Sequence, residues 1–160
     1  MKELFDVHCH MVPGVDDGAA DLEESLEMLK MQHEDGVRKI IITPHYRRRM
    51  FETPAKKVHE QFLKLQEAAK KEYPDMSLYL GCELHSNMDL QDILEKRKYV
   101  TMAGSSYVLL EFSEGDSAQH IRERVYNVLS CGYEPIIAHV ERYQACLLYT
   151  SPSPRDISGS

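Results

Sequence analysis

Two histidines near the start of the chain, His8 and His10, are separated by a single residue, Cys9. They end a short apolar stretch that favours a β-strand, in which side chains alternate between two faces. His8 and His10 would therefore share one face, with Cys9 on the other, and two imidazoles on one face can bind a single divalent ion. A lone histidine at a strand end is more often solvated than a ligand, so this pair indicates metal binding only together with further ligands.

Further histidines and glutamates stand near the ends of later predicted strands. Successive members lie about one βα unit apart, so each returns to the same face of a parallel sheet, where α/β active sites form. A glutamate can bridge two ions, and bridging carboxylates with imidazoles suit Mn, Fe or Zn better than calcium. Two such ions roughly 3.5–4 Å apart would polarise a phosphoryl group and hold a hydroxide for in-line attack. The predicted metal ligands are His8, His10, His45, Glu83, Glu111 and His139.

Charged residues that could handle a phosphate or a proton follow these predicted ligands. An arginine triplet occupies residues 47–49, and Arg142 comes shortly after the last predicted ligand. Arginines beside a metal site suit the clamping of phosphate oxygens, although a triplet also fits a solvated basic loop. Asp17, within Asp16-Asp17-Gly18, could protonate a leaving oxygen or orient water, or belong only to a turn before a helix. The predicted catalytic residues are Asp17, Arg142 and Arg47.

The remaining histidines and Glu111 allow other interpretations. His33, His59 and His120 fall within predicted helices, where we expect them to be solvated. His85 lies two residues after Glu83 on the same predicted face, so it could line the site without being a ligand. Glu111 could instead pair with a core arginine, because its apolar neighbours would bury it and a buried carboxylate requires a partner.

Strand and helix patterns alternate along the chain and must position these residues. Apolar runs predict strands at residues 4–8, 39–43, 77–83, 107–112 and 134–139. Helical periodicity predicts four intervening helices, one of which is a shorter helix at residues 89–98. Five strands joined by helices imply right-handed crossovers and a parallel sheet.

Helix signals define the other three predicted helices. Asp21 is a predicted N-cap with a glutamate three residues later, and Gly36 a predicted stop. Thr53 is a predicted N-cap, with Pro54 at the first helical position. Ser117 is the third predicted cap. The expected apolar stripes are Leu22, Leu26 and Leu29; Val58, Phe62, Leu65 and Ala69; and Ile121, Val125 and Leu129, before Gly132.

The composition excludes several classes of protein. The 160 residues suffice for one domain with a core, and the net charge of −7 argues against nucleic acid as a partner. No apolar run is long enough to cross a bilayer, and the start has no signal-peptide core. The four cysteines lack paired spacing and are expected to be reduced. We therefore expect a cytoplasmic protein without membrane insertion.

The last residues differ in character from the rest. Residues 146–156 have neither helical nor strand periodicity, and they match the translation of a widely used transposase-type sequencing adapter. We interpret residues 146–160 as a foreign, unstructured tail produced by adapter read-through, and residues 1–145 as the N-terminal part of a metallophosphatase domain. A natural Ser/Pro-rich flexible tail is the alternative.

Several motifs together resemble the polymerase-and-histidinol-phosphatase (PHP) superfamily, specifically the bacterial tyrosine-protein phosphatases of capsule and exopolysaccharide operons. The likeness runs through essentially all of residues 1–145. The motifs are Asp6-Val7-His8-Cys9-His10, Val15-Asp16-Asp17-Gly18, Thr43-Pro44-His45, Met50-Phe51-Glu52-Thr53-Pro54, Gly81-Cys82-Glu83, Leu110-Glu111-Phe112 and Ala138-His139-Val140-Glu141-Arg142-Tyr143.

The resemblance implies a distorted TIM-like (β/α)7 barrel and a trinuclear site that usually holds manganese. Its substrate would be phosphotyrosine on a partner tyrosine autokinase that controls polysaccharide export. By motif, the six predicted metal ligands match the ligands of the family, and Asp17 and Arg142 match residues tied to catalysis or phosphate binding.

The sequence departs from the family after His139. The Asp-x-His motif that supplies the last ligands of the family is absent, so about the first five of seven βα units are expected here. Two sheet edges would be exposed, and we expect the polypeptide as written to fold poorly and to turn over little.

Two alternative functions remain open from the sequence. One is another PHP phosphoesterase, such as a histidinol-phosphate phosphatase, which a preference for small substrates would reveal. The other is a non-catalytic, metal-stabilised binding module.

Overall fold

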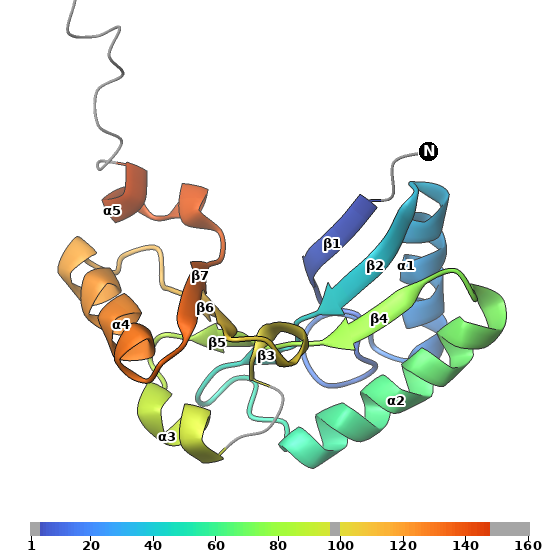
Figure 1. The fold of residues 1–160 in the computed structure, drawn as a ribbon, viewed down its shortest axis with the longest axis horizontal. Coiled ribbons are helices and arrows are strands. Elements are labelled where there is room, and N and C mark those ends of the chain that lie inside the picture. Colours follow the sequence, from blue (N-terminus) through green and yellow to red (C-terminus); the bar gives the residue numbers. More distant parts are fainter. Residues whose placement is uncertain (1–3, 97–99, 148–160) are drawn as a thin grey trace, which may run out of the picture.

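The computed structural model describes residues 4–96 and 100–147 of the chain (Figure 1). The end of the helix predicted at residues 89–98 therefore lies outside the described residues. The predicted foreign tail also lies outside them, except for residues 146 and 147, whose backbone ends the last helix, α5 (Gln144–Leu147).

Two parallel sheets, rather than one, form the centre of the fold. The first sheet has the order β1 (Leu4–Cys9), β2 (Val37–Ile42) and β4 (Ser77–Leu80). The second has the order β3 (His45–Tyr46), β5 (Glu83–His85), β6 (Tyr107–Glu111) and β7 (Glu134–Ile137). All pairings within both sheets are parallel, which confirms the expected parallel α/β arrangement.

The division into two sheets arises because the chain leaves the first sheet after β2 and after β4 and soon enters a short strand of the second sheet. After Ile42 the chain passes through Thr43 and Pro44 before β3, and after Leu80 it passes through Gly81 and Cys82 before β5. The strand predicted at residues 77–83 is therefore two strands. Backbone hydrogen bonds from Gly81 N to Ile42 O (2.8 Å) and from Glu83 N to Pro44 O (3.1 Å) continue the pairing across the break.

Close packing at this break leaves little room for a side chain at Gly81. A Cβ atom at Gly81 would lie 3.1 Å from a methyl carbon of Ile41 and 3.2 Å from the methyl carbon of Thr43. These separations are tighter than ordinary van der Waals contact, so the neighbouring side chains would have to shift by a few tenths of an ångström to admit a Cβ atom. The break can therefore bring the start of β5 directly beside the start of β3.

Helices cover the outer sides of the two sheets (Figure 1). α1 (Leu22–Glu34) packs against β2 and against α2 (Ala55–Glu72), which also contacts β4. On the other side of the molecule, α3 (Leu90–Lys96) packs against α4 (Ala118–Ser130), and α4 contacts β7. Two 3-10 turns, η1 (Met102–Gly104) and η2 (Val140–Arg142), precede β6 and follow β7.

Most of the predicted helix signals are confirmed. The Asp21 side chain accepts a hydrogen bond from Glu24 N, and Ser117 accepts one from His120 N. Gly36 and Gly132 follow the C-caps of α1 and α4 with φ of 89° and 84°, the left-handed conformation that glycine adopts at helix ends.

The predicted Thr53 cap is wrong. α2 begins at Ala55 after Pro54, with no side-chain cap. The Thr53 hydroxyl instead donates a hydrogen bond to Val15 O at 2.8 Å, so this side chain ties the start of the helix to the loop that follows β1.

Each sheet has its own hydrophobic cluster. α1 and α2 contribute Leu29 and the predicted stripe Val58, Phe62, Leu65 and Ala69 to the first. α4 contributes Ile121 and Val128 to the second. Leu22 is 37% exposed and Leu129 is 52% exposed, so these two stripe predictions are wrong: helix rotation buries Val128 in place of Leu129.

No helix among residues 4–96 and 100–147 has the length and apolar character needed to cross a bilayer.

Candidate metal centre

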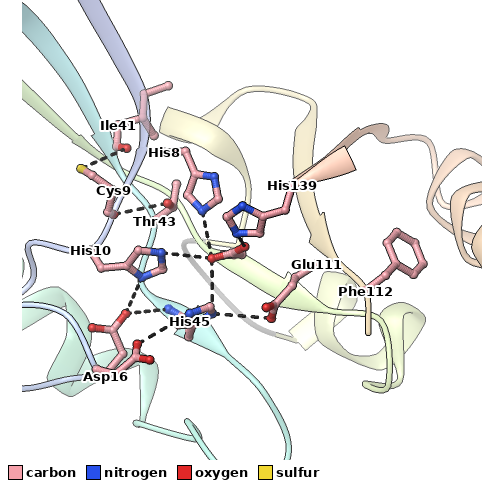
Figure 2. Close-up of polar contacts among 12 residues, drawn as sticks. His8, Cys9, His10, Asp16, Ile41, Thr43, His45, Glu111, Phe112 and His139 are labelled. Carbon is pink, nitrogen blue, oxygen red and sulfur yellow. Dashed lines mark hydrogen bonds and ion pairs between the residues drawn. The ribbon is translucent and has the colours of Figure 1, made fainter. Parts of the chain in front are cut away.

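The predicted ligands meet where the first sheet gives way to the second (Figure 2). His8 lies on β1 and His10 directly follows it, while Glu111 ends β6. His45 and Glu83 begin β3 and β5 and are register partners. Glu83 therefore lies at a strand start, and not at a strand end as predicted, whereas His45 follows β2 as predicted and begins the short β3. The breaks after β2 and β4 nevertheless place both residues just beyond the end of the first sheet.

His139 also differs from its predicted position. It follows β7 by two residues and is the N-cap of η2, with φ of 51° in the left-handed region. This conformation is uncommon for a residue with a Cβ atom. The η2 turn is fixed from behind by Tyr143, which is buried and whose hydroxyl accepts a hydrogen bond from Phe112 N at 3.1 Å. The turn thereby directs His139 toward the other histidines.

Glu83 is the centre of the cluster. Its side chain is fully buried, and its Oε2 atom lies 2.9 Å from His8 Nε2, 3.1 Å from His10 Nε2 and 3.3 Å from His45 Nδ1. Its other oxygen, Oε1, lies 3.0 Å from His139 Nε2. One carboxylate therefore contacts four imidazoles from three different segments of the chain.

These short distances do not correspond to hydrogen bonds. Among the described residues, both oxygens of Glu83 lack a partner with hydrogen-bond geometry, as do His8 Nε2, His45 Nδ1 and Glu111 Oε2. Buried polar atoms without partners are rare and costly. Buried ring nitrogens and carboxylate oxygens that converge without hydrogen bonds fit cations placed among them, and imidazole with carboxylate oxygen is a ligand set for Mn, Fe or Zn.

The described side chains form three overlapping groups that could each hold one ion. The groups are His8, Glu83 and His139; His10, Asp17 and His45; and His45, Glu83 and Glu111, with the ligand atoms of each group within 4.8 Å of one another. Glu83 and His45 each belong to two groups. All six predicted ligands are thus brought together, and Asp17, predicted as a catalytic acid, joins them as a potential ligand.

Asp16 is a residue of the site that the sequence reasoning did not select. Its side chain is fully buried and its Oδ2 atom lies 2.8 Å from His10 Nδ1. The same carboxylate accepts hydrogen bonds from His45 N (2.9 Å) and Gly18 N (3.1 Å). A carboxylate on the far nitrogen of a histidine orients the ring and fixes the tautomer in which Nε2 can bind a metal. Asp16 thus supports His10 and anchors the backbone of His45.

The protein's own charges perturb the protonation of these groups. Burial lowers the pKa of His10, but contacts with Asp16 and Glu83 outweigh it and raise the pKa to about 9. Burial raises the pKa of Glu83, yet the contacts with His10 and His8 hold it well below its usual range. Burial lowers the pKa of His45 and raises that of Glu111. An ion at His10 must therefore displace a proton, whereas His45 is already neutral near pH 7.

The predicted catalytic arginines lie together beside the metal cluster. Arg47 and Arg142 line a cleft of about 360 Å³ whose wall also includes the ligand candidates Glu111 and His139. Arg47 is half-buried and its backbone pairs with Phe51 in a short turn. The other two arginines of the triplet are exposed and do not line this cleft. Asp17 is 63% exposed, 3.7 Å from His45 Nε2.

The other histidines have structural contacts. His33 lies 3.0 Å from Asp75 and His120 lies 3.9 Å from Asp116, so both are partly buried in ion-pair contacts rather than simply solvated as predicted. His59 is also half-buried. His85 is 2% exposed and belongs to none of the three groups.

Comparison with known proteins adds independent information. The family model described as "Capsular polysaccharide synthesis, CpsB/CapC" matches residues 4–151, which overlaps the first residues of the segment interpreted as foreign. The chain is 41% identical over 142 residues to the tyrosine-protein phosphatase CpsB of Streptococcus pneumoniae. It is 31% identical over 139 residues to the tyrosine-protein phosphatase YwqE of Bacillus subtilis strain 168.

A solved structure has the same fold over most of the chain. It belongs to work on YwqE from Bacillus subtilis and CpsB from Streptococcus pneumoniae, described as unique metal-dependent tyrosine phosphatases, and superposes with a TM-score of 0.79 at 30% identity. The match covers 88% of this chain and 57% of that one. Likewise, the sequence match to the pneumococcal protein covers 89% of this chain and 58% of that protein. The match to YwqE covers 87% of this chain and 55% of YwqE. The chain therefore spans little more than half the length of these relatives.

Proposed function

Because the chain belongs to the CpsB/CapC family of capsular polysaccharide synthesis, we propose that it is the N-terminal part of a metal-dependent tyrosine-protein phosphatase. The proposed reaction is hydrolysis of a phosphotyrosine monoester on a protein. Relatives that are 41% and 31% identical to this chain are named tyrosine-protein phosphatases.

The observation that carries this proposal is the environment of Glu83. A fully buried carboxylate with four imidazole nitrogens within 3.3 Å, and no hydrogen bond to either oxygen among the described residues, suits a polynuclear metal site. A structural carboxylate would be expected to accept hydrogen bonds. Two arginines next to such a cluster suit a substrate with a doubly charged phosphoryl group.

The residues of the site have distinct proposed roles. The three groups around Glu83 and His45 would hold the ions, which when bound neutralise phosphoryl oxygens and lower the pKa of water. Asp16 keeps His10 in the ligating tautomer. Arg142 and Arg47 bind and orient the phosphoryl group from the cleft side. Asp17, as an exposed carboxylate at the edge of the cluster, is placed to ligate or to accept a proton.

Finer parts of the proposal come from the family resemblance. We propose manganese as the metal, with Fe or Zn as alternatives, and a bacterial tyrosine autokinase as the partner. We propose the cytoplasm as the setting, which is supported by the absence of a disulfide at the three cysteines whose side chains the structure describes, Cys9, Cys82 and Cys131. A distorted (β/α)7 barrel is the proposed complete fold.

The test is to express the natural reading frame extended past residue 145 in the source DNA, beside the 160-residue chain. Each protein would be assayed for release of phosphate from a phosphotyrosine peptide and from histidinol phosphate, with manganese and after chelation. We expect manganese-dependent hydrolysis of the peptide that falls at least ~100-fold in His8→Ala.

The possible outcomes separate the candidate functions. Preferential hydrolysis of histidinol phosphate would replace the tyrosine phosphatase with a small-molecule phosphatase. A folded, metal-loaded protein that hydrolyses neither ester would favour the alternative function, a non-catalytic, metal-stabilised binding module.

A further inference from the structure

The cleft beside the metal cluster contains a hydroxyl group that the proposed mechanism has not used. Ser113 lines this cleft together with Glu111, and the other hydroxyl among the described lining residues is that of Tyr143. The Tyr143 hydroxyl is already engaged with the backbone of Phe112. Ser113 follows the end of β6 and is partly buried.

The backbone of Ser113 is held in place on both sides. Its N–H donates to Asp116 Oδ2 at 2.9 Å, and its carbonyl accepts from Asp116 N at 2.9 Å. The buried Ser86 hydroxyl donates to the same Asp116 oxygen at 3.4 Å. The residue therefore stands on a fixed turn rather than on a mobile loop.

The buried ring of His85 sets the direction of the Ser113 hydroxyl. His85 Nδ1 accepts a hydrogen bond from Asn87 N at 3.2 Å, so Nδ1 carries no proton. The ring proton must then be on Nε2, which lies 3.4 Å from Ser113 Oγ. His85 is the donor in this contact and the serine oxygen is the acceptor. The hydroxyl hydrogen of Ser113 is consequently left to donate elsewhere, and the cleft is the space it borders.

We infer that Ser113 is a substrate-binding residue that donates its hydroxyl hydrogen to a non-bridging oxygen of the phosphoryl group, and that His85 is its positioning residue. This inference rests on the proposed phosphatase function. The chemistry fits because a phosphate monoester offers three non-bridging acceptors, and the cleft contains two cationic arginines with this one uncommitted hydroxyl donor. The acidic Glu114 of the same lining is exposed and lies toward solvent.

The experiment measures binding of inorganic phosphate and vanadate to the manganese-loaded chain by calorimetry, together with its metal content. The variants are Ser113→Ala, Ser113→Thr and, as a matched control, Ser86→Ala. Ser86 binds the same Asp116 but does not line the cleft, so a purely structural contribution of this turn would affect both alanine variants.

We expect Ser113→Ala to weaken phosphate binding about 10-fold, the typical effect of losing a hydrogen bond to a charged group. Ser113→Thr keeps the hydroxyl and should remain within about 3-fold of the wild type, with unchanged metal content in all variants. In the phosphatase assay, Ser113→Ala should lower kcat/KM by a similar factor.

Unchanged phosphate affinity in Ser113→Ala, or an equal loss in Ser86→Ala, would overturn the inference. The inference and the proposed function fail in different ways. If the wild type hydrolyses no phosphotyrosine but its phosphate affinity depends on Ser113, only the proposed function fails. If the wild type is an active phosphatase and Ser113→Ala matches it, only the inference fails.

Discussion

Replacement of Glu83 by glutamine tests the metal centre without relying on catalysis. Glu83 belongs to two of the three ligand groups, and only the group of His10, Asp17 and His45 lacks it. Glutamine preserves the shape of the side chain but removes the charge and one of the two metal-binding oxygens. The variant should therefore lose two of a maximum of three ions.

The expected magnitude follows from binding linkage. An ion present at 100 times its dissociation constant stabilises the folded chain by about 2.7 kcal/mol. A ~100-fold loss of affinity at the same concentration reduces that gain to about 0.4 kcal/mol per site. Manganese should therefore raise the melting temperature of the wild type by several degrees more than that of Glu83→Gln.

The assay is thermal unfolding with and without manganese, combined with metal analysis after gel filtration. The difference caused by metal is the proper readout, because Glu83 also contacts the histidines directly and its loss changes the metal-free protein. Glu67→Gln is the matched control, since Glu67 is exposed on α2 and pairs with Lys71; it should leave the metal-induced shift unchanged. If Glu83→Gln does not fold, Glu111→Gln should lose one ion, because Glu111 belongs to one group. A full metal-induced shift in Glu83→Gln would refute this description of the site.

Three further predictions concern the supports of the site. Asp16→Asn removes the carboxylate that orients His10 and should weaken metal binding by about 10- to 100-fold in calorimetry; unchanged affinity would contradict its positioning role. Gly18→Ala would make a Cβ clash with the backbone oxygen of His10 and should destabilise the chain by about 1–3 kcal/mol in denaturant unfolding, whereas Gly115→Ala, with nothing within 4 Å, should have little effect. Folding raises the pKa of His10 from 6.5 to about 9. In the metal-free protein, protonated His10 therefore contributes its full stabilisation below pH 6.5, and this contribution is lost as the pH rises through about 9. Metal affinity should therefore increase from pH 7 to 9, and binding at pH 7 should release a proton, measurable by calorimetry in buffers of different ionisation enthalpy; identical heats in all buffers would contradict this.

The sequence allowed the ligands to be predicted because their spacing follows the βα repeat. Four of the six residues lie near or just beyond the end of the first sheet, and Glu111 and His139 lie at the end of β6 and after β7 in the second. Parallel topology brings successive strand ends to one edge, which is why the spacing was informative. What the spacing could not reveal is that the chain breaks after β2 and after β4 and passes into a second sheet. Pro44 and Gly81 lie at the breaks, and both residue types disfavour a continuous strand. The sequence therefore contained a local signal for the breaks, but their effect on the arrangement of the two sheets could not be predicted from it.

Asp16 and Asp17 illustrate a different limit. Neighbouring aspartates in a turn have the same chemistry, and only the path of the backbone decides which one is buried. Gly18 allows the turn to pack against His10, which directs Asp16 inward, fully buried, and leaves Asp17 63% exposed. Likewise, the burial of Val128 in place of Leu129 depends on the rotation of α4 against the second sheet, which periodicity determines only to within a residue.

The left-handed backbone of His139 has a consequence for how this position can change. Glycine and asparagine occupy that conformation with less strain than histidine, so random substitution followed by selection for thermal stability alone would favour them at residue 139. Either replacement would remove an imidazole from the group that also contains His8 and Glu83. Stability and metal retention thus pull this single position in opposite directions, and a library screened only for heat resistance would be expected to accumulate robust but metal-deficient proteins.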